Sequence, residues 1–454
     1  MIGAGPERYT MQQQLYPPGP RGQFYIGNLR DLRNRPLELM QECVEEYGDI
    51  AHLRVANIHI YVLNHPDLVE EVLVTSNRNF IKPRLLRDTA EVFGRGLLVS
   101  DGEFWLRQRR LMAPAFHRQR IASYATVMTG YTERMLDRWE DGRELDIHAE
   151  MMRVTLEIVT KALFGADVTT EDAKRVGHAL EIMLERFVDR ISILQFLQQL
   201  PLPRNLRFRR ALATLDAIIY RIIEARRRSG ELGDDLLSML LAAQDDDGTT
   251  MSDRQVRDET VTLFLAGHET TAVSLSWTFL LLSQNPHVDT ALAEELRRVL
   301  GDRAPTLEDL PALTYTAQVV KESMRIYPPA WRVGREAIEE CEIGGYRIPA
   351  GSQLIMSQWM LHRDARYFDE PLAFRPERWT AELESALPKY AYFPFGGGPR
   401  RCIGDQFAVM EATLLLATIA RSWRVDVDTE QTIDYWPSIT LRPRHGLRAV
   451  LRRR

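Results

Sequence analysis

Phe395-Gly396-Gly397-Gly398-Pro399-Arg400-Arg401-Cys402-Ile403-Gly404 is the stretch of sequence that decides the fold. Periodic apolar residues predict a helix from Ile403 to Ser422, so Cys402 stands just before a helix start. Free backbone amides and the helix dipole favour a thiolate at such a position. Cys402 is therefore a candidate metal ligand.

The residues around Cys402 suit a large, flat and acidic ligand. Gly398 and Gly404 let the backbone approach such a ligand closely, and Phe395 can shield the sulfur. Arg400 can neutralise an acidic group beside it. A haem with its two propionates meets all of these requirements. The alternative is a buried structural cysteine beside a glycine-rich turn, which an isolated Cys-x-Gly would favour.

The segment resembles the haem-binding signature Phe-x-x-Gly-x-Arg-x-Cys-x-Gly of the cytochrome P450 family and matches it at every position. Three further segments resemble other motifs of the family and follow the same order along the chain, so the resemblance covers essentially the whole sequence. It implies a mainly α fold with a small β-sheet region. In that fold haem b (iron protoporphyrin IX), axially ligated by Cys402, lies between a long central helix and the C-terminal helix.

Ala266-Gly267-His268-Glu269-Thr270-Thr271 resembles the oxygen-binding groove of the family. Helical spacing puts small and polar side chains on one face, namely those of Leu263, Ala266, Gly267, Thr270 and Ser274. The resemblance implies two catalytic residues, because Thr270 would hold the oxygen and Glu269 would relay protons through water. His268 is expected to point away and make a structural hydrogen bond. Ordinary helix packing is the alternative for an isolated Ala-Gly-x-x-Thr.

Trp105-Leu106-Arg107-Gln108-Arg109 resembles the Trp-x-x-x-Arg of the family. The indole and the guanidinium lie one helical turn apart, so both can donate to one propionate. Arg332 stands where many members carry another propionate donor, with an ordinary strand-entry arginine as the alternative. The residues expected to contact the cofactor are thus Trp105, Arg109, Ala266, Gly267, Thr270, Arg332, Phe395, Arg400, Cys402 and Gly404.

Glu322-Ser323-Met324-Arg325 resembles the Glu-x-x-Arg of the family, and Pro376-Glu377-Arg378-Trp379 resembles its partner segment. Positions three apart share a helix face, so Glu322 and Arg325 can pair and can also engage Arg378. The resemblance implies a structural role for these charged residues. The alternative is a surface salt bridge of little energetic value.

Strand-rich parts are predicted at about 48–64, 333–360 and 424–451, and helix-rich parts at 103–327 and 403–422. The strand-rich parts are expected to pair into one small sheet. Because no repeat or linker divides the chain, residues 1–454 are predicted to form a single haem domain with no fused reductase. Helices are predicted over Glu103–Met112 with Asp101 as N-cap, Arg120–Glu140, His148–Phe164, Thr170–Phe196, Leu206–Arg228, Asp253–Asn285, His287–Leu300 and Pro311–Tyr327.

Composition narrows the class of protein further. The 454 residues are 45% hydrophobic and 27% charged, which is typical of a globular chain. Lys and Arg number 58 and Asp and Glu 63, so the net charge of −5 does not favour nucleic acid as a partner. Cys43, Cys341 and Cys402 are too few for a disulfide framework. Residues 1–22 contain neither a signal-peptide core nor a membrane span, so a cytoplasmic protein without a membrane anchor is expected.

A thiolate ligand favours O–O cleavage over oxygen storage. The resemblance therefore implies a monooxygenase that inserts one atom of O2 into a lipophilic substrate such as a fatty acid, terpenoid, steroid or polyketide-like molecule. Electrons would come from a ferredoxin or flavodoxin with its reductase. The positive docking surface would comprise Arg107, Arg110, Arg118, Arg120 and Arg401. Two alternatives stay open: a peroxide-using peroxygenase or hydroperoxide isomerase, and a non-enzymatic haem sensor.

The substrate pocket is assigned by analogy with the family. The segments expected to line it are Phe80–Val99, Ile191–Pro203, the helix near Phe264 and Ala266, and the strands after Pro329. These segments are mostly aliphatic and aromatic, which suits a ligand bound by removal of apolar surface from water. Arg84 and Arg87 could meet a carboxylate at the mouth of the pocket.

Overall fold

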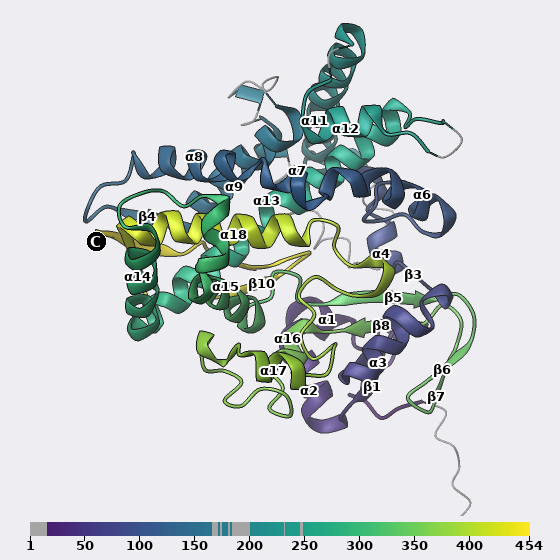
Figure 1. Ribbon diagram of the computed structural model, residues 1–454. Coiled ribbons are helices and arrows are strands. Elements are labelled where there is room, and N and C mark those ends of the chain that lie inside the picture. The colour runs from purple at the N-terminus through teal and green to yellow at the C-terminus, as the bar shows by residue number, and fades with distance from the viewer. Residues whose placement is uncertain are drawn as a thin grey trace, which may run out of the picture.

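The computed structural model describes residues 16–165, 171–172, 175–179, 182–183, 200–230, 232–245 and 248–454. The fold is mainly helical with small sheets, as predicted (Figure 1). The helix predicted over Thr170–Phe196, the connection Ile191–Pro203 and the loop Gln244–Thr250 lie wholly or partly outside the described residues. Within the described ranges, no helix combines the length and the apolar character needed to cross a bilayer.

The long helix α13 (Asp253–Gln284) runs through the centre of the molecule. It begins in a capping box, in which the Ser252 hydroxyl accepts from the Gln255 amide and the Gln255 side chain accepts from the Ser252 amide. Pro286 follows its end, and most of its residues are buried. The helices packed against it are α9 (Ile147–Phe164), α11 (Pro203–Ser229), α15 (Thr314–Ile326) and α18 (Asp405–Ser422).

Shorter helices surround this centre. They are α1 (Leu29–Asn34), α2 (Pro36–Tyr47), α3 (Pro66–Glu70), α4 (Arg84–Arg87), α5 (Ala90–Phe93), α6 (Gly102–Met112), α7 (Arg118–Ala122), α8 (Ala125–Leu136), α12 (Leu236–Ala242), α14 (Pro286–Leu300), α16 (Gln358–Leu361) and α17 (Ala381–Ala386). The predicted helices over Glu103–Met112, His148–Phe164, Leu206–Arg228 and His287–Leu300 are confirmed within a few residues.

Two details of the helix prediction are wrong, and a third is confirmed in position alone. The helix predicted over Arg120–Glu140 is two helices, α7 and α8, because Tyr124 between them is buried and its hydroxyl donates to the Asp234 carbonyl at 3.1 Å. Pro311 lies in a 3-10 turn (Leu307–Ala312), and α15 begins only at Thr314. Asp101 occupies the N-cap position of α6, yet its carboxylate makes no capping bond because it accepts from the Lys82 amide and from Arg400.

The main sheet joins segments that lie far apart in the chain. Its strand order is β1-β2-β8-β5-β3, and the pairing of β2 with β8 is parallel while the other pairings are antiparallel. The predicted pairing of 48–64 with 333–360 is confirmed. The strands are β1 (Ile50–Val55), β2 (Ile58–Leu63), β3 (Phe80–Ile81), β5 (Val333–Ala337) and β8 (Gln353–Met356).

The prediction of one sheet is wrong for the C-terminal strands. Of these, β9 and β12 form a separate sheet of order β4-β12-β9 on the far side of the molecule from β1 and β8 (Figure 1), and β10 pairs with β11 in a two-stranded sheet. The short strand β4, just before α9, pairs with one edge of β12, and β9 pairs with the other. The remaining strands are β4 (Glu144–Asp146), β6 (Cys341–Ile343), β7 (Tyr346–Ile348), β9 (Trp423–Val427), β10 (Tyr435–Pro437), β11 (Leu441–Pro443) and β12 (Arg448–Arg453).

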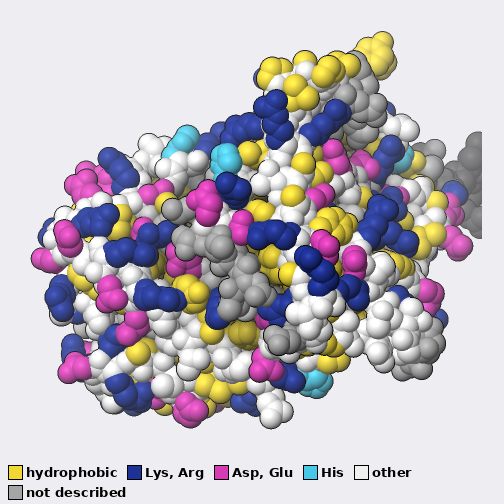
Figure 2. Space-filling view, turned by 90° about the horizontal axis from the view of Figure 1, so that it is seen from above, with side chains coloured by type: hydrophobic (Ala, Val, Ile, Leu, Met, Phe, Trp, Pro, Cys, Tyr) yellow, Lys and Arg dark blue, Asp and Glu magenta, His cyan; other side chains and the backbone are white. Residues whose placement is uncertain are grey.

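The apolar core is arranged along α13. One cluster packs around its C-terminal half with α15 and α18, and includes the fully buried Trp277. A second packs around its N-terminal half with α6, α11 and α12, and includes Phe264. Figure 2 views the molecule from above relative to Figure 1, and on this face the described surface carries both basic and acidic side chains.

Candidate functional site

The signature loop is folded by its own backbone. The Cys402 amide donates to the Phe395 carbonyl at 3.0 Å, and the Arg401 amide donates to the Gly398 carbonyl at 3.1 Å. Gly398 has φ +64°, and a Cβ there would lie 1.9 Å from the Leu73 carbonyl oxygen, so only glycine fits. At Gly404 a Cβ would meet only the Phe116 ring at 3.6 Å. The protein alone therefore gives no steric reason for glycine at position 404.

Cys402 is exposed to solvent, yet many protein atoms surround its sulfur, and this burial raises the pKa of its thiol. The Gly404 amide and the guanidinium groups of Arg109 and Arg401 oppose this rise, while Asp405 adds to it. The Gly404 amide thus acts in the direction expected for a helix start, while burial has the larger effect on this pKa. A coordinated metal would supply the missing stabilisation of the anion.

The middle of α13 has one open patch. Ala266 is exposed and Thr270 is half-buried, although the residues of the following turns are buried. The Thr270 hydroxyl donates to the Ala266 carbonyl at 2.8 Å. A Cβ at Gly267 would lie 3.0 Å from a Val159 methyl group, so this glycine lets α9 approach. Ser274 is buried, and its hydroxyl completes no hydrogen bond among the described residues.

Glu269 points to a different side of α13 from this patch. Its carboxylate accepts from the Thr440 hydroxyl at 2.6 Å, and Arg442 Nη1 lies 3.9 Å from Oε1. Burial raises the pKa of Glu269, while Arg442 and Thr440 oppose the rise. His268 is buried and its Nδ1 lies 3.1 Å from the Phe264 carbonyl, which confirms the expected structural bond.

A group of basic residues surrounds a second part of the site. Arg400 donates to the Ser100 carbonyl at 3.0 Å and to Asp101 at 2.5 Å, and it stacks over the Trp105 ring with Cζ 4.3 Å from the ring centroid. Lys82 and Arg335, which the sequence did not identify, also belong to the group. Lys82, Arg335 and Arg400 lie near one another and near Asp101, and these three cations are called the basic cluster below. Arg109 instead has Cys402 and Asp405 as its charged neighbours.

The basic cluster carries more positive charge than its acidic neighbours neutralise. Burial lowers the pKa of Arg332 and of Arg335 to about 10 and that of Lys82 far below its usual value. Asp101 partly compensates Lys82, Arg335 and Arg400. Buried cations without counter-charges are costly, so a ligand with more than one carboxylate would stabilise them. The donor set thus fits a haem, with its propionates at the cluster and its iron at Cys402.

Glu322 forms a buried charged network under the site. Its carboxylate accepts from Arg325 at 2.7 and 2.8 Å, from Arg378 at 2.8 Å and from the Trp379 indole at 3.0 Å. Both Glu322 and Arg325 are fully buried. The predicted interaction with Arg378 is confirmed, and the surface salt bridge is excluded as the alternative. The network ties α15 to the loop that precedes the signature.

The fold and these groups together define a haem-thiolate class of protein, and sequence comparison agrees. A family model described as Cytochrome P450 matches residues 17–447. The chain is 40% identical over 410 residues to cyclooctatin synthase of Streptomyces melanosporofaciens, a match that covers 89% of each chain. It is 36% identical over 409 residues to pentalenene oxygenase of Streptomyces avermitilis, covering 90% of this chain and 91% of that one. The chain belongs to the cytochrome P450 family.

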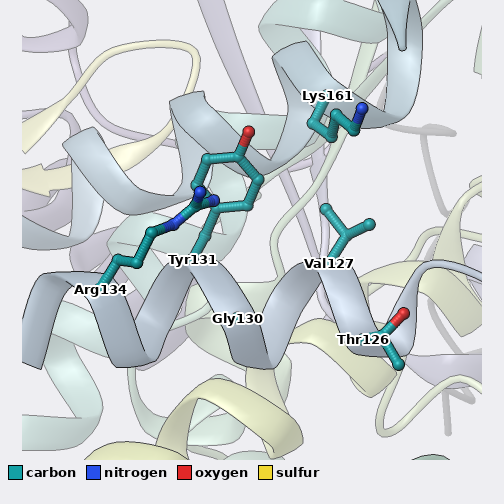
Figure 3. Close-up of a pocket in the computed structure, with 6 residues that line it drawn as sticks. All are labelled: Thr126, Val127, Gly130, Tyr131, Arg134 and Lys161. Carbon is teal, nitrogen blue, oxygen red and sulfur yellow. The ribbon is translucent and has the colours of Figure 1, made fainter. Parts of the chain in front are cut away.

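A surface hollow between α8 and α9 lies apart from this site (Figure 3). Its volume is about 480 Å³, and Arg134 stacks over Tyr131 at its edge with Cζ 3.8 Å from the ring centroid. None of its lining residues is a predicted site residue. They are Thr126, Val127, Gly130, Tyr131, Arg134 and Lys161.

Proposed function

We propose that this P450 monooxygenase oxidises a terpenoid-type substrate that lacks a carboxylate. The substrate class rests on the relatives named cyclooctatin synthase, pentalenene oxygenase and cyclooctat-9-en-7-ol 5-monooxygenase, the last 37% identical over 402 residues. Arg87 donates to Glu336 at 2.7 Å, so it is already neutralised and offers little to an acidic substrate. The observation that carries the proposal is the open patch at Ala266 and Thr270, which lies between the buried stretches 256–265 and 271–282 of the same helix.

Each group of site residues has its own role in the proposed reaction. A bound haem-thiolate supplies the activation of O2 and the insertion of one oxygen atom, while the second atom leaves as water with two electrons and two protons. Cys402 would bind the iron. The basic cluster, together with Trp105, Arg109 and Arg332, would bind the propionates. Thr270 would direct its hydroxyl at the oxygen, since only a local bond to Ala266 holds that hydroxyl. Glu269 would hold a proton inside the protein, because burial raises its pKa.

Electrons would arrive from a ferredoxin or flavodoxin. A groove of about 430 Å³ beside the signature loop is lined by Arg118, Arg401, Phe395 and Val409 among others. It offers both charge and apolar surface to a transient partner. Three of the five predicted arginines already pair with acids: Arg107 with Asp245, Arg120 with Asp234 and Arg401 with Asp405. The cytoplasmic location and the single haem domain stay predictions.

The test uses the purified, haem-loaded protein with a surrogate ferredoxin, its reductase and a terpene panel under ¹⁸O2. One ¹⁸O atom in the product is expected. Cys402→Ser should abolish the absorption of the reduced carbon monoxide complex and the turnover, whereas Cys341→Ser, a control at a half-buried thiol on β6, should retain both. Product formed only with peroxide would instead identify the peroxygenase, and a parent spectrum in Cys402→Ser would refute the proposed ligand.

A further inference from the structure

A stack of aromatic side chains leads outward from α13. Trp277 of α13 is fully buried, and its ring is nearly parallel to that of Tyr327, which follows α15, with centroids 4.6 Å apart and an interplanar angle of 20°. The Tyr327 centroid lies 5.9 Å from that of Tyr435 on β10, and the two hydroxyl oxygens are 3.4 Å apart. Trp359 of α16 packs beside both tyrosines, with its centroid 5.5 Å from that of Tyr435. Adjacent oxidisable rings are thus close enough for electrons to pass between them.

The inner end of the stack lies on the same face of α13 as Thr270. Thr270, Ser274 and Trp277 are spaced i, i+4 and i+7, so they form one row along the helix. At 1.5 Å per residue, Trp277 is about 10 Å along the axis from Thr270. The Trp277 indole donates to the Leu441 carbonyl at 2.7 Å, a bond that strengthens when the ring becomes positively charged. Trp277 is therefore placed to lose an electron to the site that Thr270 serves.

The outer end of the stack reaches the protein surface. Tyr327 and Tyr435 are both half-buried. Burial, together with the neighbouring Tyr435, raises the pKa of Tyr327, so this phenol stays protonated at neutral pH. A phenol that loses an electron also releases its proton. The contact between the two hydroxyl groups gives this proton a route towards solvent.

Arg363 decides which ring is the end of the path. Its guanidinium carbon lies 3.2 Å from the centroid of the Trp359 ring. Removing an electron from that indole would create a second positive charge beside the guanidinium, so oxidation of Trp359 is disfavoured. Tyr435 instead loses a proton together with the electron and stays neutral. The path therefore ends at Tyr435, and Trp359 only packs beside it.

We propose that Trp277, Tyr327 and Tyr435 form an electron-transfer path that draws oxidising equivalents out of the oxygen-activating site when no substrate reacts. This inference rests on the P450 activity and is independent of the proposed substrate class. In each turn, Trp277 gives one electron to the site and recovers one from Tyr327, which in turn recovers one from Tyr435. The path protects the site from its own oxidant.

The electrons and protons of this path balance. The net change in one turn is the loss of one electron from Tyr435 to the site and of its phenolic proton to solvent. Two turns supply the two electrons that, with two protons, reduce the unused oxygen atom to water. A thiol in solution restores Tyr435 after each turn by giving up one hydrogen atom, and two such thiols become one disulfide.

The first experiment locates the radical in the haem-loaded protein. An organic peracid, added without substrate, supplies the oxidising equivalents, and electron paramagnetic resonance detects the radical while a spin trap with peptide mass spectrometry maps it. A tyrosyl radical trapped at Tyr435 is expected. Trp277→Phe should lose most of this signal while its reduced carbon monoxide spectrum stays that of the parent. Trp139→Phe is the matched control, at a buried tryptophan that contacts the Trp423 ring instead, and it should keep the signal.

A second variant tests the path even if Trp277→Phe fails to fold. Tyr435→Phe keeps the ring and removes the hydroxyl, so the trapped radical should move to Tyr327. A parent without a tyrosyl radical, an equal signal in the parent and Trp277→Phe, or a radical trapped at Trp359 would each overturn the inference. A parent that shows no reduced carbon monoxide spectrum would refute the proposed haem ligand, and this inference with it.

The second experiment measures what the path does for the enzyme. A surrogate ferredoxin and its reductase drive oxygen consumption without substrate, and the loss of haem absorbance is recorded per electron consumed. Trp277→Phe and Tyr435→Phe should bleach faster than the parent, because oxidising equivalents stay at the site. Trp139→Phe should bleach at the parent rate. Equal bleaching of the parent and the two path variants would rule out the protective role.

Discussion

Burial and hydrogen bonding shift the pKa of the Cys402 thiol in opposite directions. The Gly404 amide lowers the pKa, and burial raises it by more. The position of the cysteine before a helix was readable from the sequence, but the depth of the site was not, because it depends on elements that are distant in the chain. The proposed ligand role of Cys402 rests on the signature loop, and a bound metal would stabilise its thiolate.

Arg332 gives a prediction in which one substitution has opposite effects in two states. Arg332→Leu removes a half-buried charge whose pKa is lowered by the surrounding protein to about 10, so the haem-free protein should unfold at higher urea concentration. In the haem-loaded protein the same variant should lose haem to an acceptor protein about tenfold faster, because a propionate loses a donor. Arg84→Leu, at an exposed arginine, should change neither quantity. Equal destabilisation of both states would contradict the assignment.

Glu411 gives a prediction about pH. Burial between α18 and α13 raises its pKa to about 8, an effect that Thr271 partly opposes, and neither carboxyl oxygen completes a hydrogen bond among the described residues. The unfolded carboxyl has its ordinary value of 4.5. Glu411 therefore stabilises the fold fully below pH 4.5, and this contribution is lost as the pH rises to about 8.

Glu411→Gln removes this titration and keeps the shape of the side chain. The free energy of unfolding of the parent, relative to this variant, should fall between pH 5 and pH 9 in urea titrations of the haem-loaded protein. Glu294→Gln on the exposed face of α14 should show no such trend. A parent and a Glu411→Gln variant with parallel pH profiles would show that the carboxyl is not buried in solution.

At the scale of elements, the helices with strong local signals were the predictable ones. The Ser252 capping box marks the start of α13 and Pro286 marks its end, in the sequence as in the structure. The break between α7 and α8 was not predictable, because the burial of Tyr124 against Phe407 arises from tertiary packing. Likewise α12 begins at Asp235, whose carboxylate accepts from the Ser238 amide at 2.8 Å, a cap that a short apolar run did not reveal.

The network of Glu322 makes a prediction about how elements are joined. Glu322→Ala should lower the free energy of unfolding by about 3–5 kcal/mol, because it leaves Arg325 and Arg378 as unpaired buried charges. Urea unfolding of the haem-loaded protein measures this. Glu384→Ala, which breaks the more exposed pair with Lys321, should cost about 1 kcal/mol or less. Similar losses of unfolding free energy in the two variants would mean that the Glu322 network stabilises the fold no more than an exposed salt bridge does.

At the scale of the whole molecule, sheet pairing was the least predictable feature. The sequence indicates where strands lie, but it does not say that β12 pairs with the three residues of β4 rather than with β1 or β2. The same is true of the site, where residues in local motifs were predictable and residues brought in by sheet pairing were not. Cys402, Trp105 and Arg400 follow from local motifs, whereas Lys82 and Arg335 enter the basic cluster only because the main sheet brings β3 beside β5.

The groove beside the signature loop makes a prediction about the redox partner. Arg118→Glu should slow reduction by an acidic ferredoxin about tenfold at low ionic strength and flatten its salt dependence, because charge steers the encounter. This residue is exposed and leaves the surroundings of Cys402 unchanged. Arg33→Glu on α1 is the control for net charge. A parent-like rate at every salt concentration would exclude the groove as the docking surface.

The basic cluster has a consequence for how this protein accumulates in a living cell. Its cations come from positions 82, 335 and 400, so they are brought together only after most of the chain has been synthesised. Until the propionates arrive, mutual repulsion among these cations would favour local opening and cleavage by proteases. Iron nutrition should therefore govern the yield of the intact polypeptide itself, and starving a culture of iron should shorten its half-life.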